Sequence, residues 1–163
     1  MKLLTRSRHG VRLTLEGEEL YPFIERTIYQ YQSMLEKANG IKGLDTGVIR
    51  VGTISSITCH WMPQLIKGFQ EQYPHVQFLF HQGDYTSISE WIRIGAVDFG
   101  FVSPSAVTNL NLETITDGEM LAVLPIAPPI YRTLAIAYKD KSSLPIASRY
   151  FIDYLKKNKN ELP

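Results

Sequence analysis

Small hydrogen-bonding groups follow three apolar runs of the sequence, at the points where those runs end. They are Ser55, Ser56 and Thr58 after the first run, Gln82 and Gly83 after the second, and Ser103 after the third. Hydroxyl and amide groups can hold a small molecule by hydrogen bonds. None of these groups has a neighbouring base that would make it a nucleophile. The pattern therefore indicates a binding site for a small effector rather than a catalytic centre.

Two interpretations of this site stay open. The turn from Ser55 to Thr58 precedes a predicted helix, whose free N–H groups and dipole would favour an anion. Alternatively, Ser56 or Thr58 only caps that helix. Gly83 and Asp84 also form a common turn pair, which needs no ligand to explain it.

Other reactive side chains lack the partners that catalysis or metal binding requires. Cys59 and His60 are sequence neighbours, and adjacent residues on a helix do not face each other. His75 and His81 have no metal-ligand spacing with any partner. Asp98 lies between apolar residues, with no second group for acid–base chemistry. We predict no catalytic residue, no metal, no cofactor and no enzymatic activity.

The elements that position the polar groups alternate between strands and helices. Strands are predicted at 48–54, 76–80 and 97–102, and helices over 61–73 and 88–94. This alternation implies parallel strands with right-handed crossovers, whose carboxyl ends meet at one edge. The predicted fold class is α/β, with a parallel-dominated sheet flanked by helices.

The second half of the chain predicts further strands and a terminal helix. Strands are expected at 112–115 and 120–125, separated by the turn pair Asp117-Gly118, and again at 131–138. Residues 145–157 have the apolar spacing of a helix. These elements would complete the sheet and cover one of its faces.

The N-terminal segment predicts a basic hairpin followed by a long helix. Its turn contains Arg8 and His9, and Thr14 is a suitable helix N-cap. One apolar stripe follows, stepping by three or four residues: Leu20, Ile24, Ile28, Tyr31 and Leu35. The small domain that follows is too short to bury this stripe, so we predict a dimerisation seam. The alternative is a helix that lies on its own domain.

Composition is that of a globular protein, and the length suits one domain or a domain with an appendage. The chain has 163 residues, a net charge of +1 and a single cysteine, Cys59. No apolar run reaches the length of a membrane span, and the N-terminus lacks a signal-peptide core. We expect a cytoplasmic protein with no membrane partner.

Several stretches resemble the LysR-type transcriptional regulators. Residues 4–17 resemble the wing of a winged helix-turn-helix running into a linker helix. Residues 47–74, 95–101 and 132–155 resemble parts of the effector-binding domain. The resemblance implies half of a periplasmic-binding-protein-like effector domain behind a long N-terminal linker helix. The implied partners are DNA, a small-molecule effector often held through a carboxylate, and further copies in a homodimer or homotetramer.

The resemblance also implies roles for the basic hairpin. Arg6, Arg8 and His9 would lie at the wing tip, where the family contacts DNA phosphates or the minor groove. A solvated basic terminus explains these residues equally well.

The chain departs from the family in two places. It begins at the wing, and the second effector subdomain is expected to be deleted near residues 125–128. The predicted domains are therefore a wing remnant at 1–13, a linker and dimerisation helix at 14–43, and an effector-binding subdomain at 44–163. The predicted function is LysR-type transcription regulation by a truncated chain. The alternative is a ligand-binding or dimerisation module without DNA binding.

Overall fold

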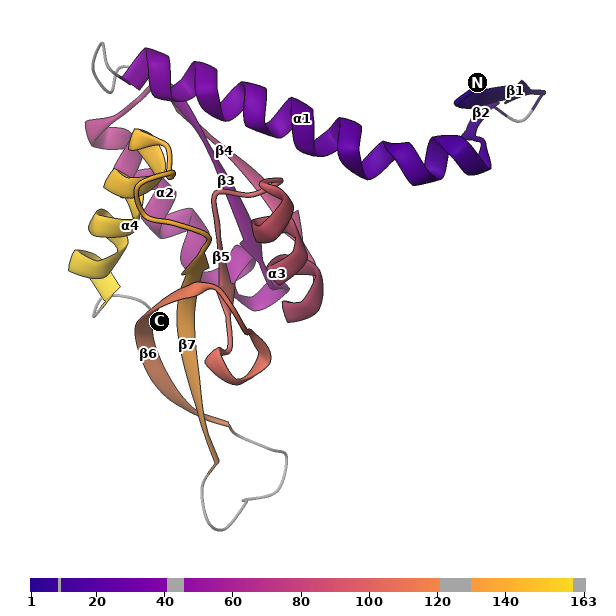
Figure 1. Cartoon of the computed structure of the whole chain (residues 1–163). Helices are drawn as coiled ribbons and strands as arrows, with labels where there is room; N and C mark the ends of the chain where they lie inside the picture. Colours follow the sequence, from indigo (N-terminus) through magenta and orange to yellow (C-terminus); the bar gives the residue numbers. More distant parts are fainter. Residues whose placement is uncertain (9, 41–45, 121–129, 160–163) are drawn as a thin grey trace.

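The protein is an α/β domain from which a long helix projects (Figure 1). The computed structural model describes residues 1–8, 10–40, 46–120 and 130–159. One five-stranded sheet lies at the centre of the domain, with helices on both of its faces. A two-stranded hairpin lies at the far end of the long helix, away from the domain. The predicted fold class is confirmed.

The central sheet has the strand order β4-β3-β5-β7-β6. Its strands are β3 (Gly47–Thr53), β4 (Val76–Gln82), β5 (Phe99–Val102), β6 (Asn111–Met120) and β7 (Ile130–Tyr138). β3 pairs in parallel with β4 and β5, as strand–helix–strand connections require. β7 is antiparallel to both β5 and β6. Parallel pairing therefore holds for the first three strands and places their carboxyl ends at one edge.

The prediction of two strands separated by Asp117-Gly118 is wrong. Both residues belong to the single strand β6 and pair with β7, with a register irregularity between Thr114 and Thr116. The long strand β7 supplies a continuous partner, and the ladder overrides the local turn signal of this pair. Most of the predicted strand 120–125 lies outside the described residues.

Two hydrophobic cores lie on opposite faces of the sheet. The helices are α2 (Met62–Gln72), α3 (Tyr85–Ile94) and α4 (Ile146–Asn158). On one face α2 and α4 meet over the sheet, with the ring centroids of Phe69 and Phe151 separated by 5.2 Å. On the other face α3 packs Ile88 and Ile92 against the sheet. The helix spacing predicted for α2, α3 and α4 thus corresponds to their buried faces.

The helix after β3 begins six residues earlier than predicted. Ser55 and Ser56 are already helical, and a π-helical turn η1 (Ile57–Trp61) leads into α2. The Thr58 N–H donates to the Ile54 carbonyl at 3.1 Å, which closes the first turn. The polar residues that were predicted to precede this helix therefore lie within it.

The long helix α1 (Leu15–Gly40) starts at the predicted N-cap. The Thr14 Oγ1 accepts a hydrogen bond from the Gly17 N–H at 3.0 Å, as a helix N-cap does. Thr14 also holds the hairpin of β1 (Leu4–Ser7) and β2 (Gly10–Leu13), because its hydroxyl donates to the Lys2 carbonyl at 2.7 Å. The hairpin is thereby tied to the start of α1.

Two glycines let α3 approach the sheet closely. Gly52 on β3 and Gly100 on β5 are partners in the parallel ladder. A Cβ atom at Gly52 would lie 2.9 Å from the Ile88 Cγ2, and a Cβ at Gly100 would clash with the same methyl group. Ile88 itself is fully buried. The two glycines thus form a notch that receives the Ile88 side chain.

We predict that Gly100→Ala destabilises the protein by about 1–3 kcal/mol, because the added methyl group overpacks the notch. Urea unfolding measures this change. Ile88→Ala should also destabilise, through lost burial. The double variant should lose clearly less stability than the sum of the two single changes. Strict additivity would show that Gly100 and Ile88 do not compete for the same space.

Candidate functional site

The predicted effector residues lie at the carboxyl edge of the three parallel strands. The Gln82 Nε2, at the end of β4, donates to the Ser55 Oγ at 2.8 Å. The Gly83 N–H donates to the Thr53 carbonyl at 3.1 Å. Ser55, Ser56 and Gln82 are exposed. The structure therefore brings Ser55, Gln82 and Gly83 together where β3 and β4 end.

The remaining predicted effector residues make local contacts. The Thr58 Oγ1 lies 3.1 Å from the Ile54 carbonyl and 3.3 Å from the Thr53 hydroxyl, so it turns toward the end of β3. Ser56 forms no side-chain cap. Ser103 follows β5, on the other side of β3, and its Oγ lies 3.0 Å from that of Ser105. The capping interpretation of Ser56 is therefore wrong.

Gly83 has a packing role at this edge. A Cβ atom there would lie 2.6 Å from the Trp91 ring, so a side chain would displace Trp91. That ring also lies 5.6 Å from the His81 imidazole, between ring centroids. Burial lowers the pKa of His81, and the nearby Arg50 guanidinium lowers it further. Trp91 thus covers the end of β4 above a histidine whose neutral form is favoured.

Asp84 starts α3. Its Oδ1 accepts a hydrogen bond from the Ser87 N–H at 2.7 Å, and this bond lowers the pKa of the Asp84 carboxyl. A carboxylate at this position also suits the positive end of the helix dipole. Asp84 is therefore the N-cap of α3 and not part of a turn pair, and this role needs no ligand to explain it.

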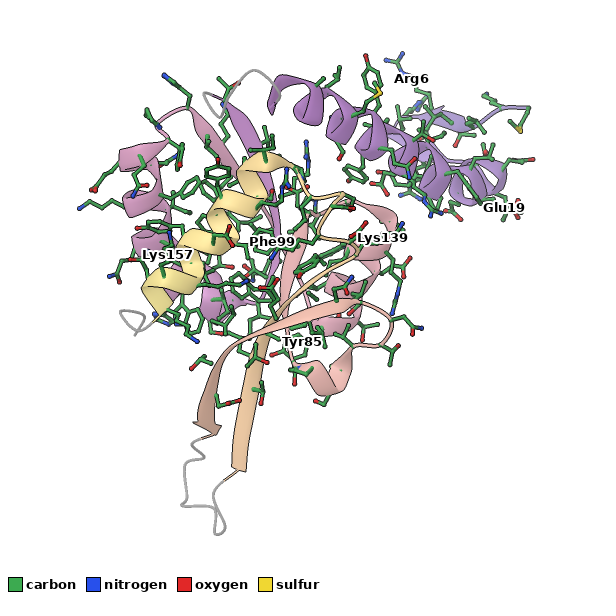
Figure 2. The ribbon with its side chains drawn as sticks, turned by 60° about the vertical axis from the view of Figure 1, so that its left-hand side comes forward. Arg6, Glu19, Tyr85, Phe99, Lys139 and Lys157 are labelled. Carbon is green, nitrogen blue, oxygen red and sulfur yellow. The ribbon has the colours of Figure 1, made fainter. Side chains whose placement is uncertain are left out.

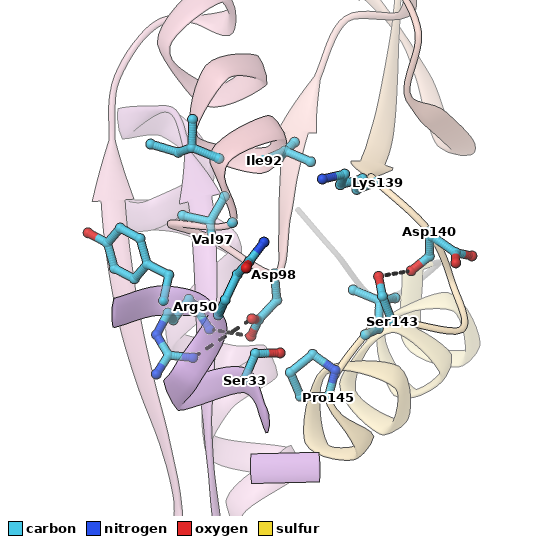
Figure 3. A pocket seen from close by; sticks show the side chains of 14 residues that line it. Ser33, Arg50, Ile92, Val97, Asp98, Lys139, Asp140, Ser143 and Pro145 are labelled. Carbon is cyan, nitrogen blue, oxygen red and sulfur yellow. Dashed lines mark hydrogen bonds and ion pairs between the residues drawn. The ribbon is translucent and has the colours of Figure 1, made fainter. Parts of the chain in front are cut away.

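A cavity of about 290 Å³ lies away from this edge, between α1 and the domain (Figure 3). Ser33 lines it from α1, Val97 from the turn between α3 and β5, and Pro145 from the N-cap position of α4. Residues from four separate stretches of the chain enclose it. The cavity exists only because α1 packs against the domain. Its lining residues are far apart in sequence, so no local pattern could have predicted the cavity.

A buried ion pair forms one side of the cavity. The side chains of Arg50 and Asp98 are 8% and 7% exposed, with the Arg50 Nη1 and Asp98 Oδ1 3.8 Å apart. The Asp98 Oδ2 accepts hydrogen bonds from the Arg50 N–H at 2.9 Å and the Ser148 Oγ at 2.7 Å. The Arg50 Nη2 donates to the Gln32 Oε1 at 3.3 Å. Asp98 thus joins β3 and α4, while Arg50 extends the network to α1.

The predicted dimerisation stripe faces away from this network. Ile24, Ile28, Tyr31 and Leu35 are 43% to 58% exposed, and Leu20 is half-buried. Tyr29 and Ser33, on another face of α1, line the cavity instead. The helix therefore contacts its own domain without covering the stripe, whose role as a seam stays a prediction.

The predicted DNA-contacting residues lie on the hairpin at the far end of α1. Arg6 is on β1 and Arg8 is in the turn, and both are exposed. Figure 2 shows Arg6 at a distance from the central sheet. His9 lies outside the described residues. DNA contact by these residues stays a prediction.

The other candidate sites form no assembled centre. Cys59 and His60 are both exposed on the π-helical turn. Within residues 1–8, 10–40, 46–120 and 130–159, no group of three or more His, Cys, Asp or Glu side chains is placed to hold a metal ion. No helix in the same ranges has the length and hydropathy to cross a membrane.

Sequence comparison identifies the domain. Residues 42–125 match the family model described as the LysR substrate binding domain. The chain belongs to the LysR family. The resemblance to the LysR family that the sequence showed is confirmed.

Curated relatives are named as transcriptional regulators. The uncharacterized HTH-type transcriptional regulator YvbU of Bacillus subtilis is 27% identical over 90% of this chain and 50% of its own length. The regulator YfeR of Shigella flexneri, also uncharacterized, is 34% identical over 71% of this chain and 38% of its own. The chain thus spans about half the length of the curated relatives it matches, or less.

Solved structures support the fold. A hydrogen-peroxide-bound mutant of OxyR from Corynebacterium glutamicum matches with a TM-score of 0.59 and 17% identity, over 99% of this chain and 81% of that one. CbnR, a LysR family transcriptional regulator, matches with a TM-score of 0.53 and 12% identity, over 94% and 84% of the two chains. At these identities the likeness concerns the fold alone.

We predict that Asp98→Asn destabilises the protein by about 3 kcal/mol or more, because the Arg50 guanidinium then stays buried without its counter-charge. Urea unfolding at neutral pH measures the loss. Glu90→Gln is the matched control: it removes the exposed pair with Arg93 and should change stability by about 0.5 kcal/mol or less. Equal small effects would contradict the structural role of Asp98.

Proposed function

We propose that this chain acts in LysR-type transcription regulation, as a sensor that binds a small effector and dimerises. The observation that carries the proposal is the hydrogen-bonded pair of Ser55 and Gln82 at the carboxyl edge of a LysR substrate binding domain. Ligands of open α/β sheets bind outside this edge. The regulator names of the relatives support the same conclusion. On this proposal the protein is cytoplasmic and not an enzyme.

The proposed effector site is an open wall rather than a closed cleft. Ser55 and Ser56 offer exposed hydroxyls in the first helical turn after β3, and Gln82 offers an amide beside them. The first N–H groups of a helix, together with its dipole, favour a carboxylate. One or two charge-assisted hydrogen bonds, set against the entropy of association, correspond to affinity of about millimolar strength. Gly83, Thr58 and Ser103 would shape the rim.

We expect small carboxylates to shift the NMR signals of Ser55 and Gln82 in a saturable titration. Ser55→Ala should weaken this binding, because it removes the hydroxyl that holds Gln82 in place. His60→Ala is the control, since His60 is exposed on the neighbouring π-helical turn and has no part in the proposed site. Weakening by His60→Ala alone would place the ligand elsewhere, and absence of any saturable shift would overturn the effector site.

The apolar stripe of α1 is the proposed dimerisation seam. Its exposed side chains can be covered by the same helix of a second copy, and amphipathic helices of this length commonly pair in that way. A homodimer is the simplest result, and a homotetramer needs a further contact.

We also propose a division of the chain into three parts: a wing remnant at 1–13, a linker helix at 14–43 and an effector subdomain at 44–163.

Replacing both Ile24 and Ile28 by Lys should convert the dimer into a monomer, because two unpaired charges would be buried in each half of the seam. Sedimentation velocity measures the species present. The control carries Lys at Glu19 and Phe23, which are exposed and lie off both the stripe and the cavity lining. The seam is wrong if the stripe variant and the unaltered chain sediment alike.

Arg6, Arg8 and His9 are proposed to contact DNA phosphates from the hairpin. Such contacts position a protein on DNA without selecting a sequence.

The proposed deletion near 125–128 falls on residues outside the described ranges. The direct pairing of β6 with β7 up to Met120 and Ile130 supports a short connection there.

A second candidate function is a dimerisation module without DNA binding. The exposed stripe on α1 favours it, because the stripe could pair with the linker helix of a longer relative. Mixing the chain with a full-length LysR regulator and measuring operator binding separates the two functions. Loss of operator binding through mixed dimers supports the module, and an unchanged operator complex argues against it.

A further inference from the structure

The cavity beneath α1 has an apolar side and a polar side. Ile92, Val97 and Leu144 contribute buried apolar groups. Tyr29 and Ser33 bring hydroxyl groups from α1, and Figure 3 shows Ser33 facing the space beside Asp98. A volume of about 290 Å³ suits a small organic molecule better than a single ion. The site therefore fits a ligand with an apolar body and one polar end.

The charges around the cavity define which polar end fits. Arg50 and Asp98 pair with each other. The Asp140 carboxylate accepts the Ser142 N–H at 3.1 Å and a further bond from the Ser142 hydroxyl at 2.5 Å, and so it closes its own turn. In the part of the chain that the structure describes, no carboxylate forms an ion pair with Lys139. Lys139 lies at the rim of the cavity (Figure 3). The Lys139 ammonium is thus the positive charge at this cavity that a ligand can pair with.

We propose that this cavity binds a small monocarboxylate with an apolar body, whose carboxylate pairs with the Lys139 ammonium. The apolar part of the ligand packs against Ile92, Val97 and Leu144. Tyr29 and Ser33 supply hydrogen bonds from the α1 side. This site is separate from the proposed effector site, because it opens beside the residues that precede β5, while Ser55 and Gln82 follow the ends of β3 and β4.

A ligand in this cavity would connect α1 to the domain. The Arg50–Gln32 hydrogen bond already joins the two at this place. A bound carboxylate adds contacts to α1 on one side, and on the other to α3, to the turn between α3 and β5, and to the residues before α4. Occupancy therefore stabilises the arrangement of α1 seen here relative to others, by the difference in affinity between them.

The test is an NMR titration of the full 163-residue chain with 3-phenylpropionate and with its uncharged analogue 3-phenylpropanamide. The carboxylate should give saturable shifts at Ser33, Val97 and Leu144, and the amide should bind more weakly. Lys139→Gln should weaken carboxylate binding by about three- to fivefold, the range of an exposed charge pair. Lys141→Gln is the matched control, because Lys141 pairs with Glu113 and lies outside the cavity lining.

A second variant tests the location. Ser33→Leu fills the cavity from α1 and should abolish the cavity shifts, while Ser55→Ala should leave them unchanged. The proposal is overturned if no saturable shift occurs at the cavity, or if the shifts are confined to Ser55 and Gln82. Equal binding of the amide, with no effect of Lys139→Gln, would overturn the carboxylate as the ligand class. If the carboxylate shifts the cavity residues but not Ser55 and Gln82, the effector site at the strand edge is contradicted and the cavity proposal stands.

Discussion

The buried pair of Arg50 and Asp98 is the interaction on which the arrangement of the parts depends. Asp98 accepts hydrogen bonds from β3 and from Ser148 on α4, and Arg50 reaches Gln32 on α1. Removing one member of such a pair leaves an uncompensated charge in the interior. The sheet, the terminal helix and the projecting helix therefore share one electrostatic centre, and the cavity lies beside it.

Two places on the domain suit small ligands for different physical reasons. The carboxyl edge offers exposed hydrogen-bonding groups at a helix start, but little apolar surface to bury. The space beneath α1 offers apolar walls and a cation, and on our proposal it would enclose a ligand more fully. The first place follows from strand topology, which the family shares. The second depends on how α1 rests on this particular domain.

Local patterns in the sequence predicted most of the fold. The Thr14 cap, the three parallel strands and the buried faces of α2, α3 and α4 follow from residue type and spacing. The continuity of β6 could not be predicted from local patterns, because Asp117-Gly118 carries a turn signal. Only pairing with β7 overrides that signal. Of the site, the Ser55–Gln82 edge was predictable from strand ends. The partners of Asp98, which lie 48 and 50 residues away in sequence, were not.

The projection of α1 gives this protein a lever arm. Its 26 residues extend about 39 Å at 1.5 Å per residue. The domain holds the helix toward one end, and the basic hairpin sits at the other. A tilt of about 10° at the domain would move the hairpin by about 7 Å, or about two base-pair steps along DNA. Small angular changes where the helix meets the domain are thereby amplified into displacements on the scale at which phosphates are spaced.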